Sequence, residues 1–180
     1  MKEIGLNGLK RWQMSKEKVW FIGDCHFGHK RIIELCGRPF SSIEEMELNL
    51  IKNWNRKIKS SDRVFITGDF ALCGKAKIIE IGQKLNGRKI LIAGNHDGAS
   101  IQTYHEAGFE AVVKYPILFN GYIISHEPVQ DYWYKNIHAH NHNKGSNDVF
   151  QFSTSVEQIG YSPIEFGEIE EYFKGFEDGV

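Results

Sequence analysis

Short apolar runs that end close to a glycine recur three times in the first hundred residues. They are Val19–Ile22 before Gly23, Val64–Thr67 before Gly68, and Lys89–Ile92 shortly before Gly94. Apolar runs of this length without alternation are typical of strands that are buried on both faces, as in parallel sheets. Helical patterns lie between the runs, so the pattern predicts a βαβαβ unit with parallel pairing.

The predicted helices in this part of the chain are residues 30–36, 43–58, 75–85 and 100–107. Ser42 and Glu45 have the spacing of a capping box, in which Glu45 reaches back to the Ser42 amide. The helix behind this box has apolar residues at helical spacing, namely Ile43, Met46, Leu50, Ile51, Trp54 and Ile58. This face is interpreted as core packing.

The pattern changes after residue 107. Residues 115–119 and 122–124 are apolar segments separated by Asn120 and Gly121, which predicts a hairpin with a type I′ turn. A further strand is predicted near residues 150–156. Ser162 is then expected to cap a final helix that has Pro163 at its first position.

Composition places the chain among soluble globular proteins. With 180 residues, 41% hydrophobic and 25% charged, it fits one domain over residues 15–180, preceded by a loosely attached extension over residues 1–14. A net charge of −1 provides no basic surface for coating nucleic acid, although it is compatible with binding a nucleotide or a strand end. No apolar run approaches the roughly 20 residues that span a bilayer. Three cysteines without a CxxC pair indicate reduced thiols and a cytoplasmic location.

Polar side chains that can bind metal follow the strands in five places. They are Asp24 with His26, Asp69, Asn95 with His96, His126, and His140 with His142. The carboxyl ends of strands in open α/β sheets form active sites. Imidazole, carboxylate and amide donors without thiolate favour Mn, Fe, Zn, Ni or Co. There are too many donors for one tetrahedral zinc ion, but they suit two ions about 3.5–4 Å apart that share a carboxylate.

The ordered motifs resemble those of the calcineurin-like metallophosphoesterase superfamily. Asp-x-His, Gly-Asp, Gly-Asn-His-Asp, a single His and a final His-x-His run from Asp24 to His142, about two-thirds of the chain. Phe27-Gly28-His29 and Arg38-Pro39-Phe40 are similar to motifs of the small, uncapped phosphohydrolases of bacteria and phages within it. The resemblance implies an α/β fold of the α+β four-layer type, with two packed mixed β-sheets flanked by helices.

The resemblance also implies a role for each motif residue. The first ion would be held by Asp24, His26 and His142, the second by Asn95, His126 and His140, and Asp69 would bridge the two. His96 would be the catalytic histidine, aimed at the leaving group, and Asp97 would orient it by hydrogen bonding. His29 and Arg38 are candidates for binding substrate, since an arginine fork suits phosphate, but structural roles are open for both.

The last motif departs from the superfamily pattern, which has a glycine before His-x-His. Here Ala139 precedes His140-x-His142, and Ile137 precedes His138-x-His140. Alanine is the smaller change from glycine, so the first register is preferred. His138 would then lie near the ions without binding one.

These observations predict a phosphoesterase with two divalent ions, Mn²⁺ being expected, that attacks phosphorus with a hydroxide bridging the ions. A chain of 180 residues leaves little room for a cap over the site, which favours a phosphodiester or a cyclic nucleotide over a monoester. The alternatives are a phosphomonoesterase, a catalytically silent binding scaffold, and a DNA nuclease that would need a substrate groove. The substrate would be a phosphate-ester small molecule or a nucleotide, and the sequence specifies no oligomeric state.

Overall fold

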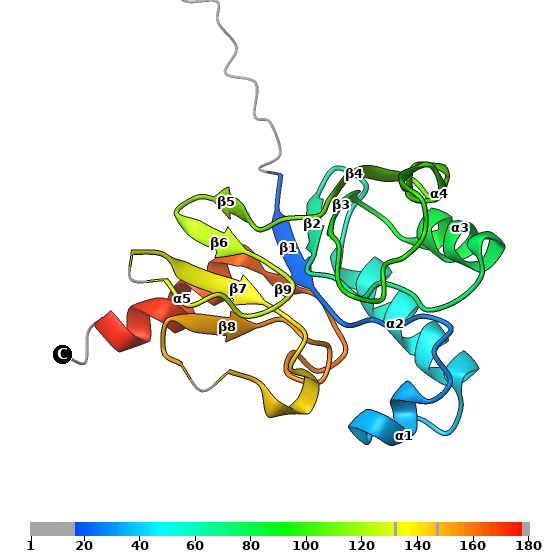
Figure 1. Cartoon of the computed structure of the whole chain (residues 1–180), viewed down its shortest axis with the longest axis horizontal. Coiled ribbons are helices and arrows are strands. Elements are labelled where there is room, and N and C mark those ends of the chain that lie inside the picture. Colours follow the sequence, from blue (N-terminus) through cyan, green and yellow to red (C-terminus); the bar gives the residue numbers. More distant parts are fainter. Residues whose placement is uncertain (1–16, 132, 147, 178–180) are drawn as a thin grey trace, which may run out of the picture.

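The chain forms two β-sheets with helices packed against them (Figure 1). This computed structural model describes residues 17–131, 133–146 and 148–177. The extension expected over residues 1–14 lies outside the described residues. The predicted α/β architecture, two packed mixed sheets flanked by helices, is confirmed.

The first sheet has five strands in the order β4-β3-β2-β1-β9. Their bounds are β1 Val19–Ile22, β2 Arg63–Ile66, β3 Arg88–Ile92, β4 Phe109–Val113 and β9 Ile164–Glu165. Strands β1 to β4 are parallel, and β9 is antiparallel to β1. The three strands expected from the apolar runs and their parallel pairing are therefore confirmed, whereas β4 was not among the predicted strands.

Three helices cover one face of this sheet: α2 (Ile43–Lys57), α3 (Lys75–Lys84) and α4 (Ile101–Glu106). The short helix α1 (Ile32–Cys36) lies beyond α2 and adds Ile32 to the same core. The predicted apolar face of α2 packs into this core. The Ser42 hydroxyl accepts the Glu45 amide as expected, but the Glu45 carboxylate binds the Ser41 amide and hydroxyl instead of the Ser42 amide. Among the described residues, none of the helices combines the length and apolar character needed to cross a membrane.

The second sheet has four strands in the order β5-β6-β7-β8. They are β5 Ile117–Phe119, β6 Tyr122–Ile124, β7 Lys135–His138 and β8 Gln151–Ser153. The predicted hairpin joins β5 to β6, and φ values of 48° at Asn120 and 84° at Gly121 are those of a type I′ turn. Strands β6, β7 and β8 are parallel. Both sheets are therefore mixed.

The final helix begins later than predicted. Helix α5 spans Phe166–Glu177, while Ile164 and Glu165 pair with Phe21 and Trp20 in β1. Extending the sheet by this short strand satisfies the backbone groups at the edge of β1. The prediction that Ser162 and Pro163 begin the helix is therefore wrong.

A second hydrophobic core lies on the other face of the first sheet. Phe21 and Phe65 from that sheet meet Ile124 and Ile137 from the second sheet, together with Phe173 of α5. Burial on both faces explains why β1 and β2 have continuous apolar sequences. The packing also brings the segments that follow β1, β2 and β3 close to those that follow β6 and β7 (Figure 1).

Candidate metal centre

Most of the candidate ligands lie in an uncommon backbone conformation. Seven of the described non-glycine residues have positive φ, and five of them are candidate ligands: Asp24 (54°), His26 (51°), Asp69 (50°), His140 (70°) and His142 (49°). These positive φ values exclude a continuous extended backbone from Asp24 to His26. Left-handed backbone at residues with side chains persists only where the surroundings impose it, and such residues cluster at functional sites.

Backbone hydrogen bonds between neighbouring loops hold these conformations. The Asp24 amide donates to the Gly68 carbonyl at 3.0 Å, and the His26 amide donates to the Asp69 carbonyl at 2.9 Å. Gly68 has a φ of +95°, and a Cβ added there would lie 2.3 Å from Nδ1 of His126. The glycine that ends the second apolar run is therefore required both for its backbone conformation and for the close approach of a candidate ligand.

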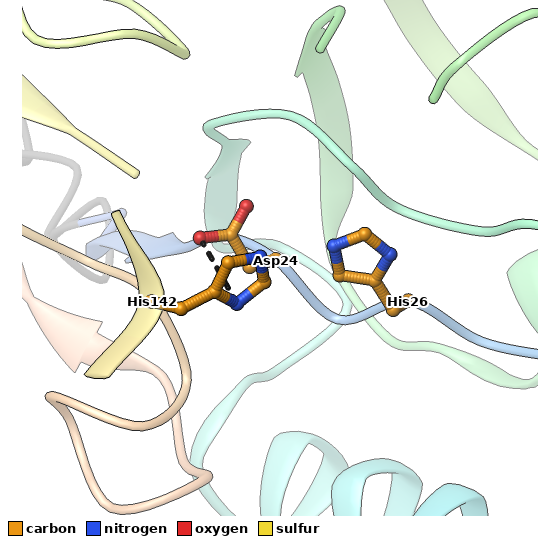
Figure 2. Close-up of side chains that lie close together, drawn as sticks. All are labelled: Asp24, His26 and His142. Carbon is orange, nitrogen blue, oxygen red and sulfur yellow. Dashed lines mark ion pairs between the residues drawn. The ribbon is translucent and has the colours of Figure 1, made fainter. Parts of the chain in front are cut away.

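Asp24, His26 and His142 form the first group that could hold a metal ion (Figure 2). One ligand atom from each lies within 4.8 Å of the other two. Asp24 Oδ1 and His26 Nε2 are buried without a hydrogen-bond partner. Buried polar atoms normally have a partner, and a cation would satisfy both the carboxylate oxygen and a lone pair on this ring nitrogen. The residues therefore fit a divalent ion.

The electrostatics of this group also suit a cation. Burial, with smaller contributions from the neighbouring His142 and Arg38, lowers the pKa of His26 to about 2, so its ring is neutral and has a free lone pair. Burial raises the pKa of Asp24, although the neighbouring His142 opposes that shift. Burial likewise lowers the pKa of His142, but its hydrogen bond to Glu157 and the nearby carboxylates outweigh burial and raise the pKa overall.

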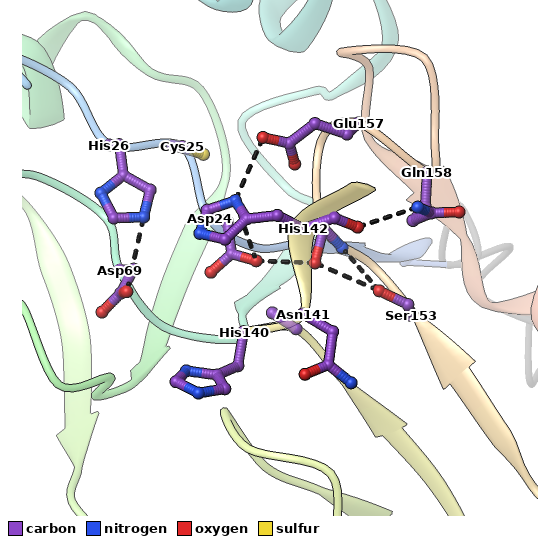
Figure 3. Close-up of polar contacts among 12 residues, drawn as sticks. Asp24, Cys25, His26, Asp69, His140, Asn141, His142, Ser153, Glu157 and Gln158 are labelled. Carbon is purple, nitrogen blue, oxygen red and sulfur yellow. Dashed lines mark hydrogen bonds and ion pairs between the residues drawn. The ribbon is translucent and has the colours of Figure 1, made fainter. Parts of the chain in front are cut away.

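Asp69 lies between the two groups of candidate ligands. Its Oδ1 accepts the His96 amide at 2.9 Å. Its Oδ2 is 3.4 Å from Nε2 of His26 and 3.6 Å from Nε2 of His126 (Figure 3 shows the former). One carboxylate oxygen thus faces a candidate ligand from each group, which is the arrangement required of a bridge between two ions.

Asn95, His126 and His140 form the second group. Nε2 of His126 is 2.9 Å from Asn95 Oδ1 and 3.1 Å from Nδ1 of His140. Nδ1 of His126 lies 2.9 Å from the Thr67 carbonyl oxygen. A proton on Nδ1 donates to this oxygen and leaves Nε2 as the ring nitrogen available to a cation. Lone pairs of oxygen and nitrogen that converge in this way fit a cation between them.

His96 and His29 lie at the rim of the centre. The ring of His96 is 5.3 Å from that of His26 and 6.1 Å from that of His29, measured between centroids. Both are half-buried, whereas His26 and Asp69 below them are buried. A ring in this position can reach a ligand bound on the solvent side of the centre.

The hydrogen bonds of the Asp97 carboxylate go to groups other than the His96 ring. Its Oδ1 accepts the Phe70 amide at 3.0 Å and the Tyr104 hydroxyl at 3.1 Å, and its Oδ2 accepts the Gly94 amide at 2.9 Å. Among the described residues its carboxylate makes no hydrogen bond to the ring. Asp97 instead ties the loop after β3 to the loop after β2, because it binds a backbone amide in each.

Arg38 does not face the site where a substrate could bind. Its side chain is 0% exposed, and its guanidinium donates to the carbonyl oxygens of Asp24 and Cys25 and to the carboxylate of Glu157. Of the two roles left open for Arg38, these contacts favour the structural one, because its donors bind a carboxylate and two carbonyl oxygens behind the loop that follows β1.

The three histidines of the last motif point to different places. The side chain of His140 extends to the second group, and that of His142 extends to the first. His138 is fully buried. Nδ1 of His138 is 2.7 Å from the Ala139 carbonyl oxygen. This placement favours the register His140-x-His142.

Two residues that the sequence did not single out contact the first group. The Ser155 hydroxyl donates to Asp24 Oδ2 at 2.6 Å. Glu157 Oε1 is 3.1 Å from Nδ1 of His142, a contact that Figure 3 shows. Burial raises the pKa of Glu157, but the hydrogen bond to His142 and the charge of Arg38 outweigh it, so its pKa is lowered overall. Neither residue belongs to a motif, so only the fold identifies them.

Comparison with known proteins places these residues in a family context. A sequence model of the calcineurin-like phosphoesterase family matches residues 17–175. The uncharacterized protein MJ1445 of Methanocaldococcus jannaschii is 35% identical over 169 residues, which span 84% of this chain and 88% of that protein. The Gene 66 protein of Mycobacterium phage L5 is 39% identical over 83 residues, 44% of this chain and 40% of that protein. The crystal structure of AQ665, a protein of unknown function from Aquifex aeolicus, has a TM-score of 0.66 at 24% identity, covers 86% of this chain and 98% of its own, and shares the fold.

Proposed function

Because the chain belongs to the calcineurin-like phosphoesterase family, whose members are metal-dependent hydrolases, we propose that it hydrolyses a phosphodiester or a cyclic nucleotide. The observation that carries this proposal is the position of Asp69, whose Oδ2 faces His26 of one ligand group and His126 of the other. A shared carboxylate is the feature that joins two divalent ions into one catalytic centre.

The proposed ligands of the first ion are Asp24, His26 and His142, those of the second are Asn95, His126 and His140, and Asp69 is common to both. When bound, the ions would lower the pKa of a water molecule and withdraw charge from the phosphoryl oxygens. Imidazole and oxygen donors fit Mn²⁺, the expected ion, and also Fe, Zn, Ni or Co.

His96 has the position of a proton donor. Its backbone is held by the hydrogen bond from its amide to Asp69, and its half-buried ring lies at the rim above His26. An ester bound to the ligand groups from the solvent side would place its leaving oxygen within reach of this ring. Proton transfer to that oxygen would contribute about 10²–10⁴-fold to the rate.

The surroundings of the centre support a diester over a monoester. Asn95 is exposed, and His29, His96, His140 and His142 are half-buried, so the ligands are open to solvent on one side. Beside Asn95 and His126 lies a surface hollow of about 340 Å³, lined also by Lys114, Tyr115 and Pro128. This space adjoins two ligands and would take a second substituent on the phosphorus.

A comparison of paired substrates tests the proposal. Mn²⁺-loaded protein is expected to cleave bis(p-nitrophenyl) phosphate, and 2′,3′-cyclic or 3′,5′-cyclic nucleotides, with a higher kcat/KM than p-nitrophenyl phosphate. A clear preference for the monoester would replace the diester assignment with a phosphomonoesterase. Two bound ions without hydrolysis of any ester would favour a binding scaffold instead.

Leaving groups of different pKa test the role of His96. We expect His96→Ala to lower kcat/KM by about 10²–10⁴-fold for diesters with alkoxide leaving groups, but far less for p-nitrophenolate, which departs without a proton. His105→Ala is the control, because His105 is exposed on α4 and binds the Phe109 carbonyl. Equal losses for both leaving groups would exclude proton donation by His96.

A further inference from the structure

We propose that Arg38, Ser155 and Glu157 are positioning residues of the first metal site: Glu157 and Ser155 orient two of its ligands, and Arg38 holds Glu157 and the backbone of one ligand. The inference rests on the proposed function in so far as Asp24, His26 and His142 bind an ion. It adds three residues that lie outside the ligand motifs.

Glu157 determines which nitrogen of His142 is free. Its Oε1 lies 3.1 Å from Nδ1 of His142, and its side chain is only 5% exposed (Figure 3). A carboxylate in this position accepts a hydrogen bond from Nδ1–H, which leaves the ring lone pair at Nε2. The same contact restricts rotation of the ring. Metal-binding histidines usually have such a partner on their second nitrogen, and for His142 the partner is Glu157.

Ser155 orients the carboxylate of Asp24. Its hydroxyl donates to Oδ2 at 2.6 Å, while Oδ1 of the same carboxylate is buried without a partner. Ser155 reaches this position because it forms a β-bridge with Gly23, the residue before Asp24. The bond leaves Oδ1 as the oxygen that is free for a cation.

Arg38 connects Glu157 to the backbone of Asp24. Its Nη2 and Nε lie 2.7 and 2.9 Å from Glu157 Oε1, and the guanidinium also donates to the Asp24 carbonyl at 2.7 Å and the Cys25 carbonyl at 3.1 Å. The planar fork can make these bonds together, whereas the point charge of a lysine cannot reproduce them. Arg38 therefore fixes Glu157 and stabilises the left-handed backbone at Asp24 (φ 54°).

Within the part of the chain that the structure describes, these three residues contact ligands of the first group and not those of the second. Among the described residues, no hydrogen bond or ion pair joins Arg38, Ser155 or Glu157 to Asn95, His126 or His140. Nδ1 of His126 is satisfied separately by the Thr67 carbonyl. Loss of the positioning residues should therefore weaken binding at the first site and spare the second, which a general loss of folding would not do.

The test follows Zn²⁺ binding at each site separately in protein labelled with ¹⁵N-histidine. Ring nitrogen signals of His142 report the first site and its tautomer, and those of His126 report the second site. In Glu157→Ala we expect the Zn²⁺ dissociation constant at the first site to rise about 10–100-fold, with less than a threefold change at the second. The His142 ring should change from one tautomer, protonated at Nδ1, to a mixture of both.

Three further variants keep the test decisive. Glu157→Gln retains an acceptor for Nδ1–H and should recover the single tautomer and most of the affinity. Ser155→Ala and Arg38→Lys should each weaken the first site selectively, and they remain informative if Glu157→Ala does not fold. Asp62→Asn is the matched control, because Asp62 is a buried carboxylate at the opposite end of β2. It should lower the unfolding temperature and leave both dissociation constants unchanged.

Folded variants with unchanged Zn²⁺ affinity at the first site would overturn the inference, as would equal weakening at both sites or failure of Glu157→Gln to restore the tautomer. These measurements need no substrate. A wild-type protein that binds two ions but hydrolyses no ester would therefore overturn the proposed function and leave the positioning role intact.

Discussion

The substitution Asp69→Asn separates metal binding from folding. In the protein without ions, the side-chain oxygen of Asn at position 69 can still accept the hydrogen bond that the backbone amide of His96 donates to Asp69 Oδ1 at 2.9 Å. The amide nitrogen would replace Oδ2, which faces Nε2 of His26 at 3.4 Å and of His126 at 3.6 Å. It can donate to either lone pair, and the substitution also removes a negative charge that raises the pKa of Asp24. The stability of the metal-free protein should therefore change by less than about 1 kcal/mol.

The effect on the metal-bound protein should be large. At an Mn²⁺ concentration of 100 times Kd, binding at one site stabilises the wild-type protein by about 2.7 kcal/mol. Loss of a residue that merely supports a ligand raises Kd by about 10–100-fold, so loss of the shared ligand should raise it at least about 100-fold. The stabilisation then falls to about 0.4 kcal/mol at the same concentration. For a chain of this size the metal-induced rise in Tm would drop from about 5–11 °C to about 1–2 °C.

Scanning calorimetry with and without Mn²⁺ measures this difference, and hydrolysis of bis(p-nitrophenyl) phosphate should disappear with it. Asp62→Asn is the control at the other end of β2, since Asp62 accepts hydrogen bonds from Trp20 Nε1 and the amides of Lys18 and Lys59. Losing one of these bonds should cost about 1.5–3 kcal/mol with or without Mn²⁺ and leave the metal-induced shift intact. A full metal-induced shift in Asp69→Asn would refute its role as the bridge.

Three other substitutions test further features of the structure. Gly94→Ala should weaken Mn²⁺ binding and lower the free energy of unfolding by about 1–3 kcal/mol, because the added Cβ would lie 2.3 Å from Oδ1 of Asp69. Gly98→Ala is the control, because the space around its Cβ is open, and it should match the wild type in scanning calorimetry with and without Mn²⁺. Tyr104→Phe removes the hydroxyl that donates to Asp97 and should lower the free energy of unfolding in urea by about 1.5–3 kcal/mol. Burial lowers the pKa of Lys89 in the folded protein, so the unfolded chain binds the proton more tightly and stability rises with pH between that lowered pKa and the ordinary 10.5. Urea unfolding across this range should show the wild type gaining stability relative to Lys89→Met as pH rises, and a parallel pH dependence of the two proteins would contradict the shift.

The local sequence was enough to predict the elements that depend on neighbouring residues. The apolar runs that became β1, β2 and β3 have no alternation because both faces of the sheet are buried, and their order along the chain implied parallel pairing. Asn120-Gly121 specified its turn because both residues tolerate positive φ. The residue types at the strand ends indicated metal chemistry, since imidazole, amide and carboxylate donors in one ordered set suit two divalent ions.

Tertiary structure decided the features that depend on distant partners. Ile164 lies in a strand, although the chain before it predicts a helix start, because the edge of β1 needs a partner. Arg38 is buried because Glu157, far along the chain, and the carbonyl oxygen of Asp24 use its donors. Asp97 binds backbone amides because two loops meet around it. The sequence by itself determined the donor types and the strands that carry them, whereas burial and hydrogen bonds between segments far apart in the chain decided which donors converge and what holds them in place.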